Sequence, residues 1–510
     1  MSEKKKPNRL TLHPLAGGQQ AIEDLLMLAT EGQTSGHPSP QIQIICRYLR
    51  AQGAIASVWQ RDVQDPDFLA EHGAYYARWS YKVPRFCHRL HFFATPSTAD
   101  DVLDAIEAWS AETEPAAYLG FVTIRPIVQS PIGATFLKRP EPASKDFVHA
   151  QDRFPVNLAG WRLYIEATPF MQQDNAVGAC AQAAIWMALR TLRWREGRSA
   201  LNPAQITSSA TRFFVSGRTL PNRQGLRLEQ ITEVVRSAGY SPHLIQLRSQ
   251  PEIQEGDFDA TSQASVQQKL YPYVESGIPV LLALTPSSGG HAVVVIGHRW
   301  NSGGPDPGVQ GQYWQRRNTE FIDASAWARP FLIHNDNTGP YLELPALPSA
   351  GEYALQHAAW AIPLLPAEIL VDAAEAKTAC LGLVTALFAS ETFKWPAQVV
   401  TRMRLLPRAK FRETICQSEK IDSLKRFFRM KWLPSYIWLL ECYGLDGYSQ
   451  ATEGQARKIA EVLLEPNADP LDGHFLCAVA HDGLLAGDAS APLVVDRDPF
   501  EGDIKLLLMS

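Results

Sequence analysis

The sequence predicts an α+β fold in which a central domain lies between two flanking α/β regions. In the centre, helical patterns come first and short apolar strand patterns follow, an order typical of α+β domains. The chain has 510 residues, enough for about three domains of ordinary size. We therefore expect an N-terminal α+β region at 1–155, a central domain at 156–350 and a C-terminal helix-plus-strand region at 351–510.

The N-terminal region carries one helix pattern and two strand patterns. Residues 41–51 (QIQIICRYLRA) have the apolar spacing of a helix, whereas 90–93 and 117–125 are rich in aromatic and β-branched residues. Pro126 ends the second strand, because proline cannot donate a hydrogen bond to a sheet. Residues 138–152 are polar and contain proline, so we expect a loop or a domain boundary there.

Cys180 begins the clearest helix of the central domain. The apolar residues that follow fall at i, i+3, i+4, i+7, i+8 and i+11, which is one helical face: Ala181, Ala184, Ile185, Ala188, Leu189 and Leu192. Further helices are expected at 225–239, where Gly239 caps the end, and at 265–276. Strands are expected at 279–284, 291–297, 330–334 and 341–344. In the C-terminal region we expect a helix at 366–388 and strands at 458–464 and 474–480.

Composition and cysteine usage argue against several classes of protein. The net charge of −5 gives no general attraction to nucleic acid or to an anionic membrane, and no apolar stretch is long enough to span a bilayer. The first residues (MSEKKKPNRL) lack the apolar core of a secretory signal. The seven cysteines are an odd number without a Cys-x-x-Cys pair, which disfavours a disulfide framework or a structural zinc site. We expect a cytoplasmic protein without metal or cofactor.

The segment around Cys180 (MQQDNAVGACAQAA, 171–184) has the features of a nucleophile site. A cysteine at a helix N-terminus lies in the positive end of the helix dipole, which stabilises the thiolate and lowers the pKa. Gln173 precedes it by seven residues, so its amide and the Cys180 N–H are candidates for an oxyanion hole, with Gln172 as the rival glutamine. The alternative is that Cys180 only packs in the core, as most free cysteines do.

Two later segments offer partners for this cysteine. His291 opens the strand GGHAVVVIG (289–297), and the strand in FLIHNDNTGPYLEL (331–344) ends at Asn335 and Asp336. If these strands pair antiparallel, the histidine and the acid are neighbours, and the acid orients the imidazole as in a catalytic triad. We prefer Asp336 as this third residue, with Asn335 as its alternate. His334, two residues before Asp336 on the same face, is left open as an alternate to His291. His298 falls on the opposite face of its strand and is expected to be structural.

The order Cys, His, Asp with a preceding glutamine resembles papain-like cysteine peptidases, most closely the C39-like branch. The resemblance covers about residues 165–350 and is carried by the cysteine segment, HAVVVIG and the HNDNTGPY turn. It implies a papain-like domain in which Cys180 is the nucleophile, His291 the general acid–base, Asp336 the orienting residue and Gln173 the oxyanion donor. The implied activity is cleavage of a peptide or isopeptide bond in a protein substrate. A glutamine deamidase or transglutaminase on the same triad is the alternative.

The C-terminal region contains a basic and aromatic run, LKRFFRMKW (424–432). Lys425, Arg426 and Arg429 interleave with phenylalanine and tryptophan, a pattern that can bind an acidic protein partner or single-stranded nucleic acid. A non-catalytic binding scaffold that uses this run is a third hypothesis, and a regulatory protein partner fits the large flanking regions. The alternative is an amphipathic helix with a solvated basic face. We expect no membrane partner.

Overall fold

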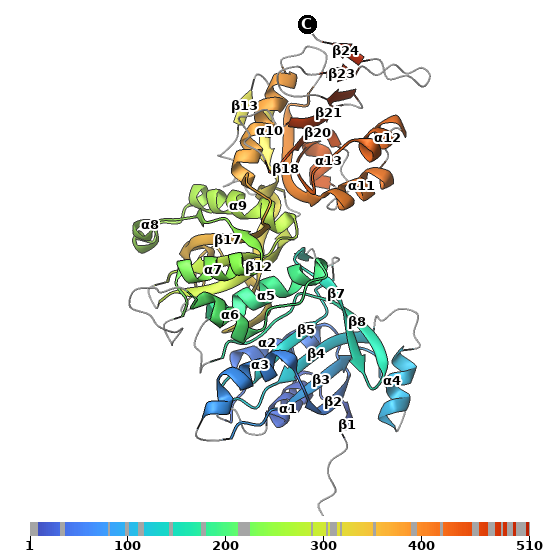
Figure 1. The fold of residues 1–510 in the computed structure, drawn as a ribbon, viewed down its shortest axis with the longest axis vertical. Helices are drawn as coiled ribbons and strands as arrows, with labels where there is room; N and C mark the ends of the chain where they lie inside the picture. Colours follow the sequence, from blue (N-terminus) through green and yellow to red (C-terminus); the bar gives the residue numbers. More distant parts are fainter. Residues whose placement is uncertain are drawn as a thin grey trace, which may run out of the picture. The chain divides into compact units, whose positions relative to one another are not determined.

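The fold is described from a computed structural model (Figure 1). Helices and strands both contribute widely, so the expected mixed α and β class is confirmed. The structure describes residues 9–30, 36–79, 82–96, 101–110, 117–141, 146–174, 180–212, 225–286, 289–301, 304–305, 314–316, 319–349, 353–388, 395–418, 422–450, 458–467, 475–480, 483–486, 493–495 and 506–508.

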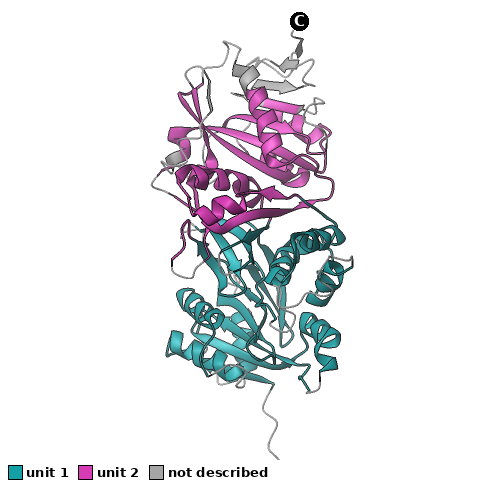
Figure 2. Cartoon of the chain, turned by 90° about the vertical axis from the view of Figure 1, so that its left-hand side faces the viewer, with its two compact units in different colours: residues 1–242, 279–297, 331–344 teal, residues 243–278, 298–330, 345–510 magenta. Residues whose placement is uncertain are grey.

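The chain forms two compact units, shown in different colours in Figure 2. Unit 1 contains residues 1–242, 279–297 and 331–344, and unit 2 contains residues 243–278, 298–330 and 345–510. No division between units falls near residue 155, and the expected central domain is shared between the two. Local composition did not indicate this division, because each unit is assembled from segments that are distant from one another in the sequence.

The N-terminal part of unit 1 is an antiparallel sheet with the order β1-β2-β3-β4-β5. Its strands are β1 (Leu10–Pro14), β2 (Ala56–Val63), β3 (Cys87–Phe93), β4 (Tyr118–Ile124) and β5 (Ile132–Leu137). Its helices are α1 (Gln19–Ala29), α2 (Pro40–Ala51), α3 (Pro66–Ala74), the turn η1 (Tyr76–Arg78) and α4 (Val102–Ser110).

Local sequence explains the central elements of this part. The Ser39 side chain accepts a hydrogen bond from the Ile42 N–H, and Pro40 occupies the first turn of α2, so the predicted helix is confirmed with a defined start.

Strand β4 is buried on both faces. Gly120 in β4 has a φ of +104°, and a Cβ there would lie 1.9 Å from the Phe136 carbonyl oxygen. Only glycine allows β4 and β5 to approach this closely.

The remainder of unit 1 combines three helices with a second group of strands. Neighbouring strands follow the order β11-β12-β15-β16, and β6 pairs with β12. The elements are β6 (Asp146–Val148), the hairpin β7 (Asp152–Leu158) and β8 (Trp161–Ala167), α5 (Cys180–Arg195), α6 (Pro203–Ala210), α7 (Leu228–Ser237), β9 (Tyr240–Pro242), β11 (Val280–Leu284), β12 (His291–Trp300), β15 (Ala328–Asn335) and β16 (Gly339–Leu344). Strands β12 and β15 each have one end in unit 2.

Most of the elements predicted for this stretch are confirmed, with one exception. The helices at Cys180 and before Gly239 are present, and the four strands lie where they were expected. The segment 138–152, expected to be a loop, contains β6. This short strand exists because it pairs with β12, where a Cβ on Gly297 would lie 2.1 Å from the Phe147 carbonyl oxygen. Sequence periodicity over three residues cannot reveal such a pairing.

Unit 2 is built on a sheet with the order β13-β14-β18-β19-β20-β21-β22-β23-β24, in which only β14 and β18 run parallel. The elements of this unit are β10 (Ile245–Gln246), α8 (Gln250–Glu255), α9 (Ala260–Glu275), β13 (Trp314–Arg316), β14 (Thr319–Asp323), η5 (Ala324–Trp327), η6 (Leu355–His357), β17 (Ala358–Pro366), α10 (Ala373–Phe388), β18 (Gln398–Pro407), α11 (Arg408–Gln417), α12 (Asp422–Met430), β19 (Tyr436–Gly444), α13 (Leu445–Gln450), β20 (Lys458–Leu464), β21 (Phe475–Ala480), β22 (Gly483–Ala486), β23 (Leu493–Val495) and β24 (Leu506–Leu508).

The predicted C-terminal elements are present in unit 2. The long helix begins at Ala373 rather than at Pro366, because Pro366 is the last residue of β17. Strand β20 has the predicted bounds, and β21 begins one residue later than predicted. Within the described part of the chain, no helix has the length and apolar character needed to cross a membrane.

Candidate active site

Cys180 is the first residue of α5, at the helix N-terminus where the sequence placed it. None of the seven cysteines, all of which lie in the described part of the chain, forms a disulfide. Five of them are buried, whereas Cys180 is half-buried and Cys416 is exposed. The apolar residues that follow Cys180 along α5 form the buried part of the helix. The helix is therefore anchored in the core of unit 1 while the thiol at its start keeps partial access to solvent.

The surroundings of the Cys180 thiol act on its pKa in opposite directions. Burial is the largest effect and, together with the Asp336 charge, raises the pKa of Cys180 to about 11. The backbone N–H groups of Ala292 and Ala181 and that of Cys180 itself lower the pKa. The expected effect of the helix N-terminus is present, but burial outweighs it. The thiol is therefore protonated at neutral pH, which corrects the expectation of a stable thiolate.

His291 begins β12, and its imidazole is held by two asparagines from the turn after β15. Its Nε2 atom lies 2.9 Å from Asn335 Oδ1, and its Nδ1 atom lies 3.4 Å from Asn337 Nδ2. Burial lowers the pKa of His291 to about 4, although the hydrogen bond to Asn335 opposes this. The imidazole is therefore neutral at physiological pH, and a neutral imidazole can accept a proton.

The structure distinguishes between the two candidates for the third residue. Asn335 makes the direct hydrogen bond to His291, and its Oδ1 also accepts from the Asn337 N–H at 3.0 Å. Asp336 Oδ1 lies 3.6 Å from His291 Nε2. The geometry thus favours Asn335 over the preferred Asp336 as the residue that orients the imidazole. The cause is an irregularity in the pairing of β15 with β16 between Ile333 and Asn335, which a residue pattern does not reveal.

The Asp336 carboxyl group is fully buried beside this site. Within the described residues, neither carboxyl oxygen has a hydrogen bond of ordinary geometry, although the N–H groups of Asp336 and Asn337 lie nearby. Burial raises the pKa of Asp336 well above its ordinary value, and the backbone N–H groups of Asp336 and Asn337 only partly oppose this. Burial therefore disfavours the orienting carboxylate that the sequence suggested.

The two glutamines before Cys180 have different environments. The Gln172 amide accepts from the Ile132 N–H at 3.1 Å and donates to the Gln129 carbonyl at 3.3 Å. It is therefore committed to the N-terminal sheet. Gln173 is half-buried and remains the candidate oxyanion donor. Residues 175–179, which connect this segment to Cys180, lie outside the described residues.

Neither of the other two histidines contributes its imidazole to this cluster. His334 is buried, its Nδ1 lies 3.2 Å from the Pro169 carbonyl, and its ring packs edge-on against Tyr341. His298 Nε2 lies 3.0 Å from Glu275 Oε2 in unit 2. His334 therefore has a packing role, and His298 belongs to a buried ionic network.

The basic and aromatic run forms α12 in unit 2. Leu424 and Phe428 are buried in a hydrophobic cluster, whereas Arg426 and Arg429 are exposed and Lys425 is half-buried. This is the arrangement of an amphipathic helix with a solvated basic face. It agrees with the alternative given for this run, and binding of a partner by the basic face stays a prediction.

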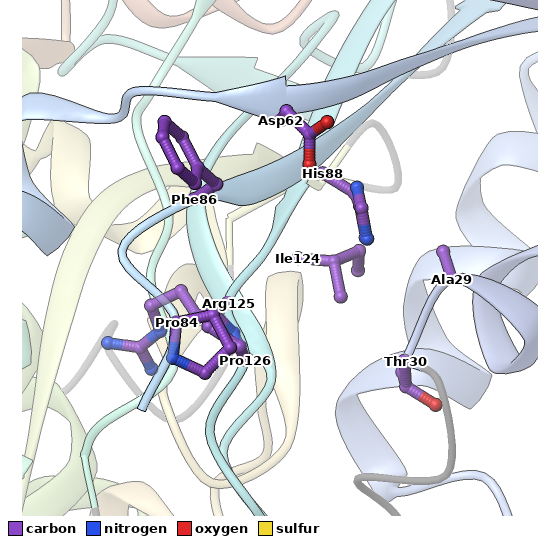
Figure 3. Close-up of a pocket in the computed structure, with 9 residues that line it drawn as sticks. All are labelled: Ala29, Thr30, Asp62, Pro84, Phe86, His88, Ile124, Arg125 and Pro126. Carbon is purple, nitrogen blue, oxygen red and sulfur yellow. The ribbon is translucent and has the colours of Figure 1, made fainter. Parts of the chain in front are cut away.

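One described cavity lies elsewhere in unit 1, as shown in Figure 3. It has a volume of about 170 Å³, and its lining includes Asp62, His88 and Arg125. None of the candidate catalytic residues lines it. The cavity therefore does not mark the site around Cys180.

Sequence reasoning missed two residues that contact the site. Asn337 faces His291 Nδ1, and Gln41 donates from Nε2 to the Asp336 carbonyl oxygen at 2.8 Å. Asn337 lies within the recognised motif, so its position was a usable signal. Gln41 belongs to a helix 295 residues away in the chain, and no local pattern links it to the site.

Comparison with known proteins does not assign this chain to a family. No protein-family model matches the sequence, and no curated protein matches it. The function must therefore be argued from the site. Cys180 lies at a helix N-terminus, and its thiol contacts the N–H of Ala292, the residue after a histidine whose neutral imidazole is oriented by an amide. These are groups that nucleophilic attack on a carbonyl group requires.

Proposed function

We propose that the chain is a cysteine-nucleophile hydrolase of the papain-like, C39-like type that cleaves a peptide or isopeptide bond in a protein substrate. The observation that carries the proposal is the hydrogen bond between His291 Nε2 and Asn335 Oδ1. His291 is the first residue of β12, and this end of the strand also contacts Cys180. The Ala292 N–H, which directly follows His291, contacts the Cys180 thiol. These two contacts, which link residues singled out in the sequence, support the proposal.

The proposed reaction begins from a neutral pair. His291 accepts the thiol proton as Cys180 Sγ bonds to the substrate carbonyl carbon, and the carbonyl oxygen becomes an oxyanion. The Cys180 N–H and Gln173 are the candidate donors to that oxyanion. The imidazolium then protonates the leaving amine as the carbon–nitrogen bond breaks and leaves a thioester. Water, deprotonated by His291, hydrolyses the thioester and restores the thiol.

The proposed compartment and the type of amide attacked are argued from the same residues. Seven cysteines without a disulfide, one of which is the proposed nucleophile, suit a reducing compartment such as the cytoplasm. The oriented imidazole does not distinguish a backbone amide from a glutamine side chain, because that choice is made by the loops around the nucleophile. Deamidation and transglutamination are therefore alternative outcomes of the same test.

The test is mass spectrometry of protein and peptide mixtures after incubation with the purified chain. We expect new peptide termini that are absent with Cys180→Ala and present with Cys416→Ser, which removes the exposed cysteine. A mass gain of about 1 Da at glutamine would indicate deamidation, and a cross-link would indicate transglutamination. If the wild-type chain and Cys180→Ala give the same products, the proposal is wrong.

A further inference from the structure

One face of helix α2 contacts the turn that carries the histidine partner. Gln41, Ile44 and Tyr48 are spaced i, i+3 and i+7, so they lie along one side of the helix. Gln41 Nε2 donates to the Asp336 carbonyl oxygen at 2.8 Å. Ile44 lies so close to Gly339 that a Cβ on the glycine would be 2.6 Å from Ile44 Cγ2. Gln41 therefore contacts the turn between β15 and β16, and Ile44 contacts the first residue of β16.

The third contact fixes the end of the same turn. The Tyr48 ring stacks on the Tyr341 ring, with centroids 5.0 Å apart and planes at 19°. Tyr341 has a φ of +51°, a strained conformation for an aromatic residue. Its hydroxyl donates to the Leu137 carbonyl at 2.9 Å and accepts from the Thr168 N–H at 3.0 Å. Strain of this kind persists only where the surroundings determine the conformation.

The anchored turn is continuous with the groups that hold His291. The Asp336 carbonyl, which Gln41 binds, lies between Asn335 and Asn337. Asn335 Oδ1 bonds to His291 Nε2, and Asn337 Nδ2 faces His291 Nδ1. The Asp336 carbonyl is buried, so losing its donor leaves an unsatisfied acceptor and frees the peptide to rotate. Any such rotation moves both asparagines relative to the imidazole.

We propose that this face of α2 is a positioning device for the catalytic turn and that Gln41 is a positioning residue for the reaction. The inference rests on the proposed function, which supplies the reaction that His291 serves. It gives the N-terminal region a defined role: residues 41–48 hold the Asn335–Asn337 segment in the geometry that orients the imidazole. The region is then part of the catalytic unit, not a separable flank.

The test replaces Gln41 with methionine, which has a similar shape and no amide. The matched control is Gln43→Met, on the exposed side of the same helix. We expect Gln41→Met to lower kcat about tenfold, the value of one hydrogen bond, and to change KM by less than roughly twofold. The ¹⁵N signals of the His291 imidazole should shift in Gln41→Met and stay unchanged in Gln43→Met.

Two outcomes would overturn the inference. One is a lower melting temperature in Gln41→Met with unchanged kcat and unchanged His291 signals, which would mean a purely structural role. The other is an equal effect of Gln43→Met. If Gln41→Met does not fold, Ile44→Val tests the same face. We expect it to lower kcat by a smaller factor, and an unchanged kcat would contradict the proposal. The His291 signals need no substrate, so they decide the role of Gln41 even if the wild-type chain shows no hydrolysis.

Discussion

Two fully buried carboxyl groups, Asp336 in unit 1 and Glu441 in unit 2, have opposite environments. Glu441 accepts two hydrogen bonds from Arg404 at 3.0 Å and lies 2.5 Å from Lys458 Nζ. Burial by itself would raise the pKa of Glu441, but Arg404, Lys458 and Arg402 together hold it well below its ordinary value. Around Asp336 only backbone N–H groups oppose the rise in pKa that burial causes.

This difference separates a structural network from a candidate catalytic site. A buried charge that is fully paired contributes to the integrity of its surroundings, and removing one partner is costly. A buried polar group without full compensation requires another explanation, and a catalytic role is one of the known explanations. In this chain the uncompensated carboxyl lies beside the half-buried thiol and the oriented imidazole. The predictions below test that division.

The largest expected effect is on catalysis. His291→Ala should lower turnover of the folded protein by about 10³-fold, because general acid–base catalysis is lost. His298→Ala removes a histidine from the same strand and should leave the turnover of folded protein within about twofold, since this imidazole serves the ionic network. Steady-state kinetics on the substrate found by mass spectrometry measure both values. Equal losses of turnover in the two variants would show that the two histidines do not differ in role.

The next largest effect is on stability. Glu441→Gln should lower the free energy of unfolding by about 3–5 kcal/mol, because it removes the charged partner of Arg404 and weakens the pairing of the buried Arg402 and the half-buried Lys458. The control is Glu413→Gln, which removes the exposed ion pair with Lys410 and should cost less than about 1 kcal/mol. Urea denaturation followed by tryptophan fluorescence gives both values. A small loss in Glu441→Gln would show that the network is not a structural core.

A smaller effect distinguishes Asn335 from Asp336. Asn335→Ala should lower kcat by about 10²-fold through misorientation of His291, whereas Asp336→Asn should lower it by less than about threefold. The raised pKa of Asp336 means that folded wild-type chain loses stability as pH rises above the unfolded value near 4. Asp336→Asn lacks this loss, so its stability relative to wild type should increase with pH. A 10²-fold loss in Asp336→Asn would restore the aspartate as the orienting residue.

The smallest and most direct test concerns the protonation of the thiol. With the pKa of Cys180 at about 11, its alkylation by iodoacetamide should increase about tenfold per pH unit between roughly pH 7 and 10. The neutral His291, with a pKa of about 4, provides no imidazolium in this range to stabilise a thiolate. Peptide mass spectrometry follows Cys180 separately from the exposed Cys416. A constant, fast rate from pH 5 upward would indicate a preformed ion pair instead.

Much of the local structure could be predicted from the sequence. The apolar spacing after Cys180 predicted α5, and the serine–proline start and helical spacing account for α2. The meeting of His291 with the end of β15 followed from assuming that two short apolar strands pair antiparallel. These features depend on residues close together in the chain, for which side-chain periodicity is a direct physical signal.

The preference for Asn335 over Asp336, the raised pKa of the thiol and the contact of Gln41 with the turn were decided only by the tertiary structure. The first depends on the pairing irregularity after Ile333, the second on how much water burial removes from Cys180, and the third on a contact across 295 residues. The sequence by itself determined which residues are candidates for the chemistry and which elements present them. Register, desolvation and long-range contact arise from packing between distant segments, so only the folded chain could decide how those groups are oriented and charged.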